Sequence, residues 1–138
     1  MAVAKTFAVE AQAAYRFLVG DFGFQGPEKI SARQDRVSWY RDGLRVTVLL
    51  DILDQAVVTQ IVAEADGIRF VTSLEALAEA AGLVGHGRFK SGAQTSRAMR
   101  VTLAAQADAV RELQPLLSGP DLVTLMDTAA ARRSEIAG

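Results

Sequence analysis

The one histidine of this chain lies in a glycine-rich segment whose composition suits the binding of an anion. His86 stands between two glycines and is followed by Arg88 and Lys90, and a helix is expected to begin near Arg97. Flexible backbone amides, nearby cations and a helix N-terminus together favour a bound phosphate or carboxylate. The spacing is not that of a phosphate loop, which needs Gly-x4-Gly-Lys-Ser/Thr directly after a strand. A solvated connector is the commoner origin of such a segment, and a ligand at residues 85–97 is kept as the alternative.

Four basic residues and no acidic one occur in residues 80–107, directly after an acidic block. The basic residues are Arg88, Lys90, Arg97 and Arg100, whereas residues 42–79 carry seven acidic side chains and two basic ones. The formal net charge of −1 therefore hides two adjacent blocks of opposite sign. Because complementary charge steers and selects protein partners, we expect the basic block to contact another protein. Four cations in a chain of this net charge fall short of the pattern typical of nucleic-acid binding.

Carboxylates cluster where strands are expected to end. Asp51 and Asp54 are three residues apart, and Glu64 and Asp66 flank the next hairpin turn. Paired carboxylates can act as general acid and base or hold a hard divalent cation. Aspartate at a turn more commonly satisfies its own backbone, so we interpret these residues as turn formers and expect neither a metal nor a cofactor.

Nucleophilic catalysis finds little support in the sequence. The chain has no cysteine, and only Ser91, Thr95 and Ser96 lie near its single histidine. A serine or threonine needs an adjacent base to act as a nucleophile, and no Gly-x-Ser-x-Gly elbow occurs. We therefore name no catalytic residue and favour a protein that is not an enzyme.

Two neighbouring aromatic residues occur in an expected strand. Trp39 and Tyr40 are adjacent, so their side chains point to opposite faces of a sheet. One of them belongs to the core, and the other is a candidate anchor for a partner, with Arg36, Arg41 and Arg45 close by. Ordinary strand packing is the commoner explanation. Tyr40 is retained as a candidate partner-binding residue.

The elements that would position these residues begin with a helix over residues 5–19. Phe7, Ala11, Ala14 and Leu18 recur at helical spacing and form its apolar face, and Gly20 suits its C-terminus. A β-meander follows, punctuated by Asp42-Gly43 and Asp66-Gly67, which are favoured in two-residue hairpin turns. Four or five antiparallel strands are expected, at residues 36–41, 44–53, 57–64 and 68–71, with an edge strand at 29–33.

Three helices are expected after the meander. A capping box at residues 72–75 begins the first, which ends at Gly82. The second runs over residues 97–113 and is interrupted by Pro115, since proline cannot donate the helical hydrogen bond. The third begins at Pro120, and the last eight residues are expected to fray. The fold class is α+β, with all three helices packed on the sheet.

The composition indicates the number of domains and the kind of protein. The 138 residues are half hydrophobic and 22% charged, which is typical of one globular domain spanning residues 1–138. The sequence has no signal-peptide pattern and no long apolar run, so we expect a cytoplasmic protein without a membrane contact. Abundant Ala, Val, Arg and Asp with little Lys suggests a bacterial source. Three helices supply more apolar surface than a small sheet buries, which makes a homodimer plausible.

The aromatic and glycine placement resembles that of a family. Residues 17–24, Phe-Leu-Val-Gly-Asp-Phe-Gly-Phe, followed by Val-Ser-Trp-Tyr at 37–40 and Leu-Arg-Val-Thr-Val at 44–48, are similar to small uncharacterised bacterial α+β proteins. Some of those proteins resemble immunity proteins of toxin systems. The similarity covers roughly residues 7–80 and rests on residues that serve folding, so it transfers no functional residue.

The leading hypothesis is a non-enzymatic protein-interaction module, immunity-like or an adaptor, that binds another protein or itself. The alternative is a small-molecule binder or enzyme that acts on an anionic ligand at the 85–97 loop.

Overall fold

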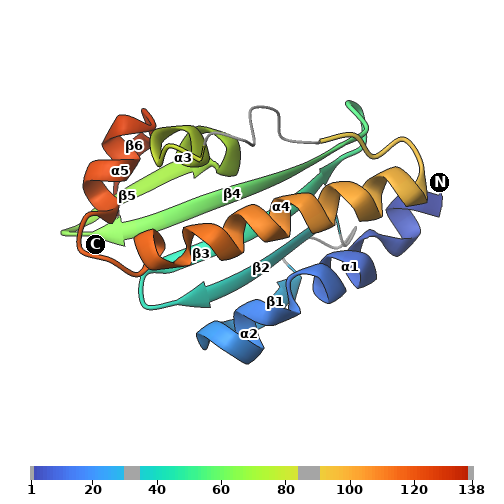
Figure 1. Ribbon diagram of the computed structural model, residues 1–138, viewed down its shortest axis with the longest axis horizontal. Coiled ribbons are helices and arrows are strands. Elements are labelled where there is room, and N and C mark those ends of the chain that lie inside the picture. Colours follow the sequence, from blue (N-terminus) through green and yellow to red (C-terminus); the bar gives the residue numbers. More distant parts are fainter. Residues whose placement is uncertain (1, 30–34, 84–90, 137–138) are drawn as a thin grey trace.

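The computed structural model describes residues 2–29, 35–83 and 91–136, which form a helical layer on a six-stranded sheet (Figure 1). The elements are, in chain order, α1 (Ala2–Ala14), α2 (Arg16–Phe22), β1 (Gln25–Lys29), β2 (Arg36–Arg41), β3 (Leu44–Asp51), β4 (Ala56–Ala65), β5 (Ile68–Ser73), α3 (Leu74–Ala80), α4 (Ser96–Leu117), α5 (Leu122–Thr128) and β6 (Arg132–Glu135). The α+β class, the N-terminal helical segment and the three C-terminal helices agree with the sequence-based expectation.

The sheet is an antiparallel meander in the order β1-β2-β3-β4-β5-β6. Six strands replace the expected four or five, because a short edge strand stands at each side. β1 begins at Gln25, and residues 30–33 of the expected edge strand lie outside the described residues. β6 occupies the segment that was expected to fray, since it pairs with β5 and the amide of Ile136 donates to the carbonyl of Gly67.

The two Asp-Gly turns are confirmed. Asp42 and Gly43 have φ of 46° and 79°, and Asp66 and Gly67 have φ of 52° and 76°. Positive φ at both central positions is the geometry that joins antiparallel strands with the correct twist. In the antiparallel meander the β2–β3 and β4–β5 turns lie at the same end of the sheet.

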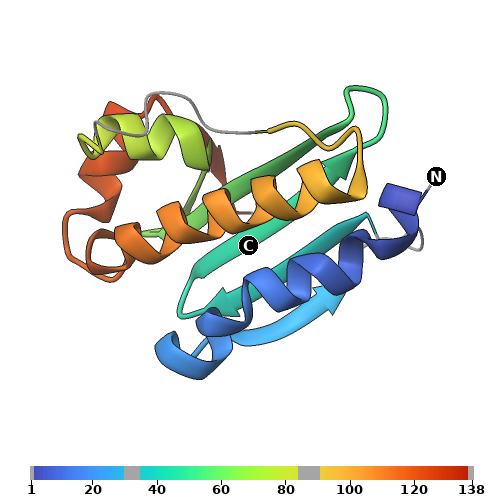
Figure 2. The same ribbon diagram turned by 45° about the vertical axis from the view of Figure 1, so that its right-hand side comes forward.

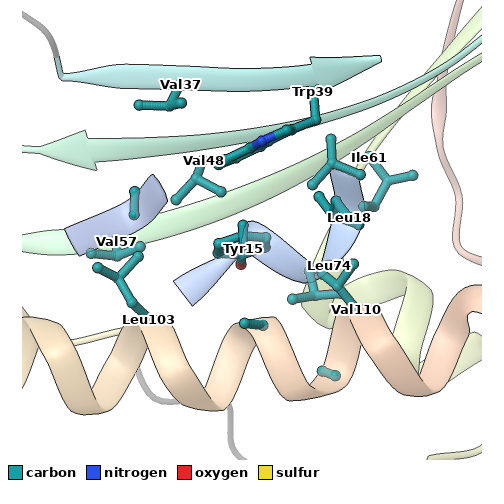
Figure 3. Packing of buried hydrophobic residues seen from close by; sticks show 14 of the residues in the cluster. Tyr15, Leu18, Val37, Trp39, Val48, Val57, Ile61, Leu74, Leu103 and Val110 are labelled. Atoms are coloured by element: carbon teal, nitrogen blue, oxygen red, sulfur yellow. The ribbon is translucent and has the colours of Figure 1, made fainter. Parts of the chain in front are cut away.

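The helices lie on one face of the sheet, with α1 and α4 side by side across its middle (Figures 1 and 2). Alternate strand residues point toward them and are buried, among them Val48, Val57 and Ile61, and Val57 lies beside Leu103 of α4 (Figure 3). The apolar stripe of α4 is thus core. Outside this stripe α4 also carries two exposed aliphatic side chains, Val101 at 47% and Leu116 at 40% exposure.

Several boundaries differ from those expected. The N-terminal helix breaks at Tyr15, and α2 continues to Phe22 because Phe17 and Leu18 are both buried; it ends at Gly23, with φ 73°, instead of Gly20. Pro115 lies inside α4, which continues because a proline in the last turn disturbs few hydrogen bonds.

The N-cap of α3 lies one residue after the expected position. Ser73 takes this role through a hydrogen bond from the amide of Ala76 to its hydroxyl (3.1 Å), whereas Thr72 is a buried strand residue. Ser73 is at the same time the last residue of β5, where it pairs with Gln60.

Candidate functional site

The candidate residues do not converge on one place. Tyr40 lies on β2 and points away from the helical layer, whereas Arg97 and Arg100 are exposed near the N-terminus of α4, within that layer. His86, Arg88 and Lys90 lie outside the described residues. The chain therefore offers two separate candidate surfaces.

The first surface is the side of the sheet that faces away from the helices, called here the uncovered face. In the described part of the chain no helix lies on it (Figures 1 and 2). Its residues follow from the alternation and register of β2 to β5: Arg36, Ser38, Tyr40, Arg45, Thr47, Leu49, Asp51, Ala56, Val58, Gln60, Val62, Glu64, Arg69, Val71 and Ser73. The leucine and the three valines among them are only half-buried, whereas the leucines and valines on the helical side of these strands are buried.

Exposure settles the roles of the adjacent aromatic residues. The side chain of Trp39 is buried at 1% exposure and stacks on Tyr15, with ring centroids 5.2 Å apart, whereas Tyr40 is 40% exposed. The guanidinium of Arg45 lies 5.7 Å from the centroid of the Tyr40 ring. The amide of Gly43 donates to the Tyr40 hydroxyl (3.1 Å), so the side chain is contacted over its ring and at its hydroxyl.

Arg45 links Tyr40 to the first strand. One of its nitrogens lies 3.9 Å from a carboxylate oxygen of Glu28, an exposed pair worth little to stability. A hollow of about 410 Å³ lies beside them, lined by Gln25, Gly26, Pro27, Glu28, Ser38, Trp39, Tyr40 and Arg45. The edge of the uncovered face is therefore hollowed beside the exposed ring of Tyr40.

Arg41 does not belong to this group, which corrects the expectation that it lies beside the exposed aromatic residue. Its guanidinium donates to the carbonyl of Phe22 and to the hydroxyl of Ser118, both at 2.6 Å, and stacks over Phe24 at 4.6 Å from the ring centroid. It is on the helical side because adjacent strand residues alternate. Arg41 therefore ties α2, β2 and the end of α4 together.

A larger hollow near Arg41 has no counterpart among the sequence-based expectations. It measures about 540 Å³ and lies between the β2–β3 turn, the end of β4 and the α4–α5 connection. Leu44, Ala63 and Leu117 are buried residues in its wall. In the sequence these residues have the pattern of ordinary core positions, so no signal pointed to a hollow there.

Both edges of the sheet resist the addition of another strand. β1 contains Pro27, which has no amide hydrogen, and its register with β2 is irregular between Gln25 and Glu28. β6 is four residues long and three of these are charged. Proline, irregular register and charge are the features that prevent edge-to-edge pairing, so a partner would have to pack on a face.

The second surface surrounds the N-terminus of α4. A hollow of about 460 Å³ is lined there by Gly92, Thr95, Arg97, Ala98, Val101 and Thr102. The Thr95 hydroxyl accepts from the amide of Ala98 (3.0 Å), and that of Thr102 donates to the carbonyl of Gly92 (2.7 Å). Both hydroxyls therefore serve the local structure already.

Asp51 and Asp66 serve turns, as expected, whereas Glu64 makes an ion pair between two strands. Asp51 accepts a hydrogen bond from the amide of Asp54 (3.1 Å), and Glu64 pairs with Arg69 at 3.6 Å. Within residues 2–29, 35–83 and 91–136, no group of three or more His, Cys, Asp or Glu side chains could hold a metal ion.

Burial raises the pKa of Tyr15 well above its ordinary value. Its phenol remains protonated at neutral pH and is inaccessible to a substrate, so the group is structural.

Comparison of the chain with protein-family models, with curated proteins and with solved structures finds no match. The resemblance to immunity proteins therefore stays a prediction. None of the described helices has the length and apolar character needed to span a bilayer.

Proposed function

We propose that this chain is a non-enzymatic protein-interaction module, of an adaptor or immunity-like kind, that binds its partner with the uncovered face of the sheet. The observation that carries the proposal is the 40% exposure of Tyr40 beside half-buried aliphatic residues on a broad sheet. A bacterial cytoplasmic setting, suggested by composition, is part of the same proposal.

The chemistry of this face suits a protein partner. Tyrosine and arginine are enriched among the residues that dominate binding energy, particularly where aliphatic neighbours exclude water. Tyr40 and Arg45 stack on each other, so their rotamers are restrained before binding. Restrained side chains lose less entropy on association, which favours affinity.

The experiment compares a variant on the uncovered face with a matched variant on the helical layer. Val62 lies between Arg45 and Val71 in the register, and Val62→Glu places a carboxylate in the middle of the face. Val101→Glu makes the same change at a 47% exposed position of α4. Tagged wild-type protein and both variants are used as baits in extracts of the source cell, with circular dichroism as the control for folding.

We expect Val62→Glu to lower recovery of the captured partner at least about ten-fold, as the loss of a central interface contact does, while Val101→Glu retains it. Equal recovery by wild-type protein and Val62→Glu would contradict the proposed surface. Loss confined to Val101→Glu would move the contact to the N-terminus of α4.

The hollow beside Arg97 favours a second candidate function, the binding of a small anionic ligand at residues 85–97, of which 85–90 lie outside the described part. A ligand that binds only the folded state raises the melting temperature. A rise with phosphorylated metabolites that disappears in Arg97→Glu would support this candidate, and no rise at millimolar ligand would reject it.

A further inference from the structure

We infer that the partner on the uncovered face is a second copy of this chain, so that two sheets pack face to face around a two-fold axis; this inference rests on the proposed function. Dimers with two-fold symmetry need a surface that is complementary to itself. The register of the six strands allows that complementarity to be examined residue by residue.

The size of the face fits a dimer interface. Six strands about 4.8 Å apart, each about 20 Å long, give a projected area of about 500 Å². Side chains corrugate this surface, so its accessible area is larger and approaches the roughly 800 Å² per partner of a stable interface. Both edges are blocked by Pro27 and by the charged β6, which leaves face packing as the mode of self-association.

The centre of the sheet fixes where the axis lies. β3 and β4 are its two longest strands and its middle pair, with eight and ten residues. An axis along the strands between them places β3 over β4 of the second copy, β2 over β5 and β1 over β6. This rotation does not move a residue along the strand direction. Residues that share a cross-strand row within one sheet therefore lie opposite each other between the two sheets.

The apolar residues then meet one another. Leu49 and Val58 are register partners on β3 and β4, so Leu49 of each copy lies over Val58 of the other. Tyr40 lies in the same cross-strand row as Val71, so Tyr40 of each copy faces Val71 of the other. The short side chains of Ser38 and Thr47, joined by a 2.8 Å hydrogen bond, leave the two sheets free to approach.

The charges are complementary as well. Arg132 of β6 lies in the same row as Val71, and among the described residues no acidic group pairs with it. The rotation carries it over Gln25, the β1 residue of the same row. Gln25 lies in the hollow whose rim includes the 67% exposed Glu28 side chain, which lies 3.9 Å from Arg45 of its own chain. An arginine from each copy thus enters a hollow with a carboxylate on its rim.

The test uses sedimentation to measure the mass in solution of wild-type protein, of two charge variants and of an equimolar mixture of the two variants. Arg132→Glu places two carboxylates together at each Glu28 contact, and Glu28→Arg places two guanidinium groups there. A mixed dimer of the two variants pairs opposite charges at both contacts. Both residues are exposed, so folding should survive, and circular dichroism checks this.

We expect wild-type protein to be mostly dimeric at about 50 µM chain, because interfaces of standard size bind with dissociation constants in the micromolar range or tighter. Each variant alone should be largely monomeric, and the equimolar mixture should recover the dimer. Leu49→Lys and Val58→Glu form a second pair: each alone buries an unpaired charge and should break the dimer, and their mixture pairs the lysine with the glutamate and should restore it. Monomeric wild-type protein would overturn the inference, as would a mixture that stays monomeric. Neither result decides the proposed function, because the capture experiment with Val62→Glu detects any protein on this face.

Discussion

The phenol oxygen of Tyr15 lies 2.7 Å from Oγ1 of Thr59 inside the core. Thr59 in turn donates to the amide oxygen of Gln106 (2.7 Å), so the Tyr15 hydroxyl is the donor to Thr59. The amide nitrogen of Gln106 donates to the carbonyl of Val57 (2.9 Å). This chain of hydrogen bonds joins the break between α1 and α2 to β4 and α4, and buried polar chains of this kind favour a unique core arrangement.

The raised pKa of Tyr15 predicts a loss of stability in alkali. The unfolded chain releases this proton near pH 10.0, the ordinary value, whereas the folded chain retains it to higher pH. Above the unfolded pKa the unfolded state therefore binds fewer protons, and the free energy of unfolding falls by up to about 1.4 kcal/mol per pH unit. Urea unfolding of wild-type protein and Tyr15→Phe across this range measures the difference, and parallel curves would contradict the assignment.

Arg41 is expected to contribute to stability. Arg41→Ala removes hydrogen bonds to Phe22 and Ser118 and the stacking on Phe24, and should lower the free energy of unfolding by about 1–3 kcal/mol. Arg16→Ala, an exposed change on α2, is the matched control and should stay within about 0.5 kcal/mol of the wild type. Chemical denaturation measures both, and equal effects would remove the role given to Arg41.

Two glycines should respond in opposite directions to alanine. Gly26 has φ of 130°, and a Cβ there would lie 2.9 Å from the carbonyl oxygen of Ser38, so Gly26→Ala should cost about 1–3 kcal/mol. Gly20 lies in α2, and a Cβ added there would meet nothing within 4 Å, so Gly20→Ala should stabilise the helix by about 1 kcal/mol. Melting temperatures that shift the same way would contradict the local geometry.

Arg97 opposes the partial positive charge at the start of α4, whose first turn has no acidic residue. Arg97→Glu should therefore raise the free energy of unfolding by about 0.3–1 kcal/mol, an effect that salt reduces. Arg97→Gln is the control and should give a smaller gain. Denaturation at low and high salt checks this, and a destabilised Arg97→Glu would mean that the guanidinium has a stabilising contact.

Local chemistry explains which parts of the fold are predictable from sequence. Asp42-Gly43 and Asp66-Gly67 are residue types that readily adopt the positive φ of these turns, so the sequence alone predicts both hairpins. β6 has the sequence of a charged tail and β1 contains a proline; each is a strand only because a neighbour supplies its hydrogen bonds. Pairing between distant segments leaves no such local pattern.

The candidate site shows the same limit. Alternation predicts that Trp39 and Tyr40 point to opposite faces, but the helical layer decides which of them is exposed. The two arginines differ in the same way. Arg41 donates to Phe22 and Ser118 on the helical side, whereas Arg45 lies over the ring of Tyr40 on the uncovered face. No property of a single arginine in the sequence distinguishes these two environments.

The most direct test of the uncovered face as a contact surface is the chemical reactivity of its tyrosine. The chain has two tyrosines, of which Tyr40 is 40% exposed and Tyr15 is fully buried, so Tyr15 is an internal control. Tyrosine nitration is measured in wild-type protein in its associated state and in Val62→Glu under the same conditions. We expect Tyr40 to be protected in the wild type and modified in the variant, with Tyr15 unmodified in both. Equal modification of Tyr40 in the two proteins would contradict this expectation.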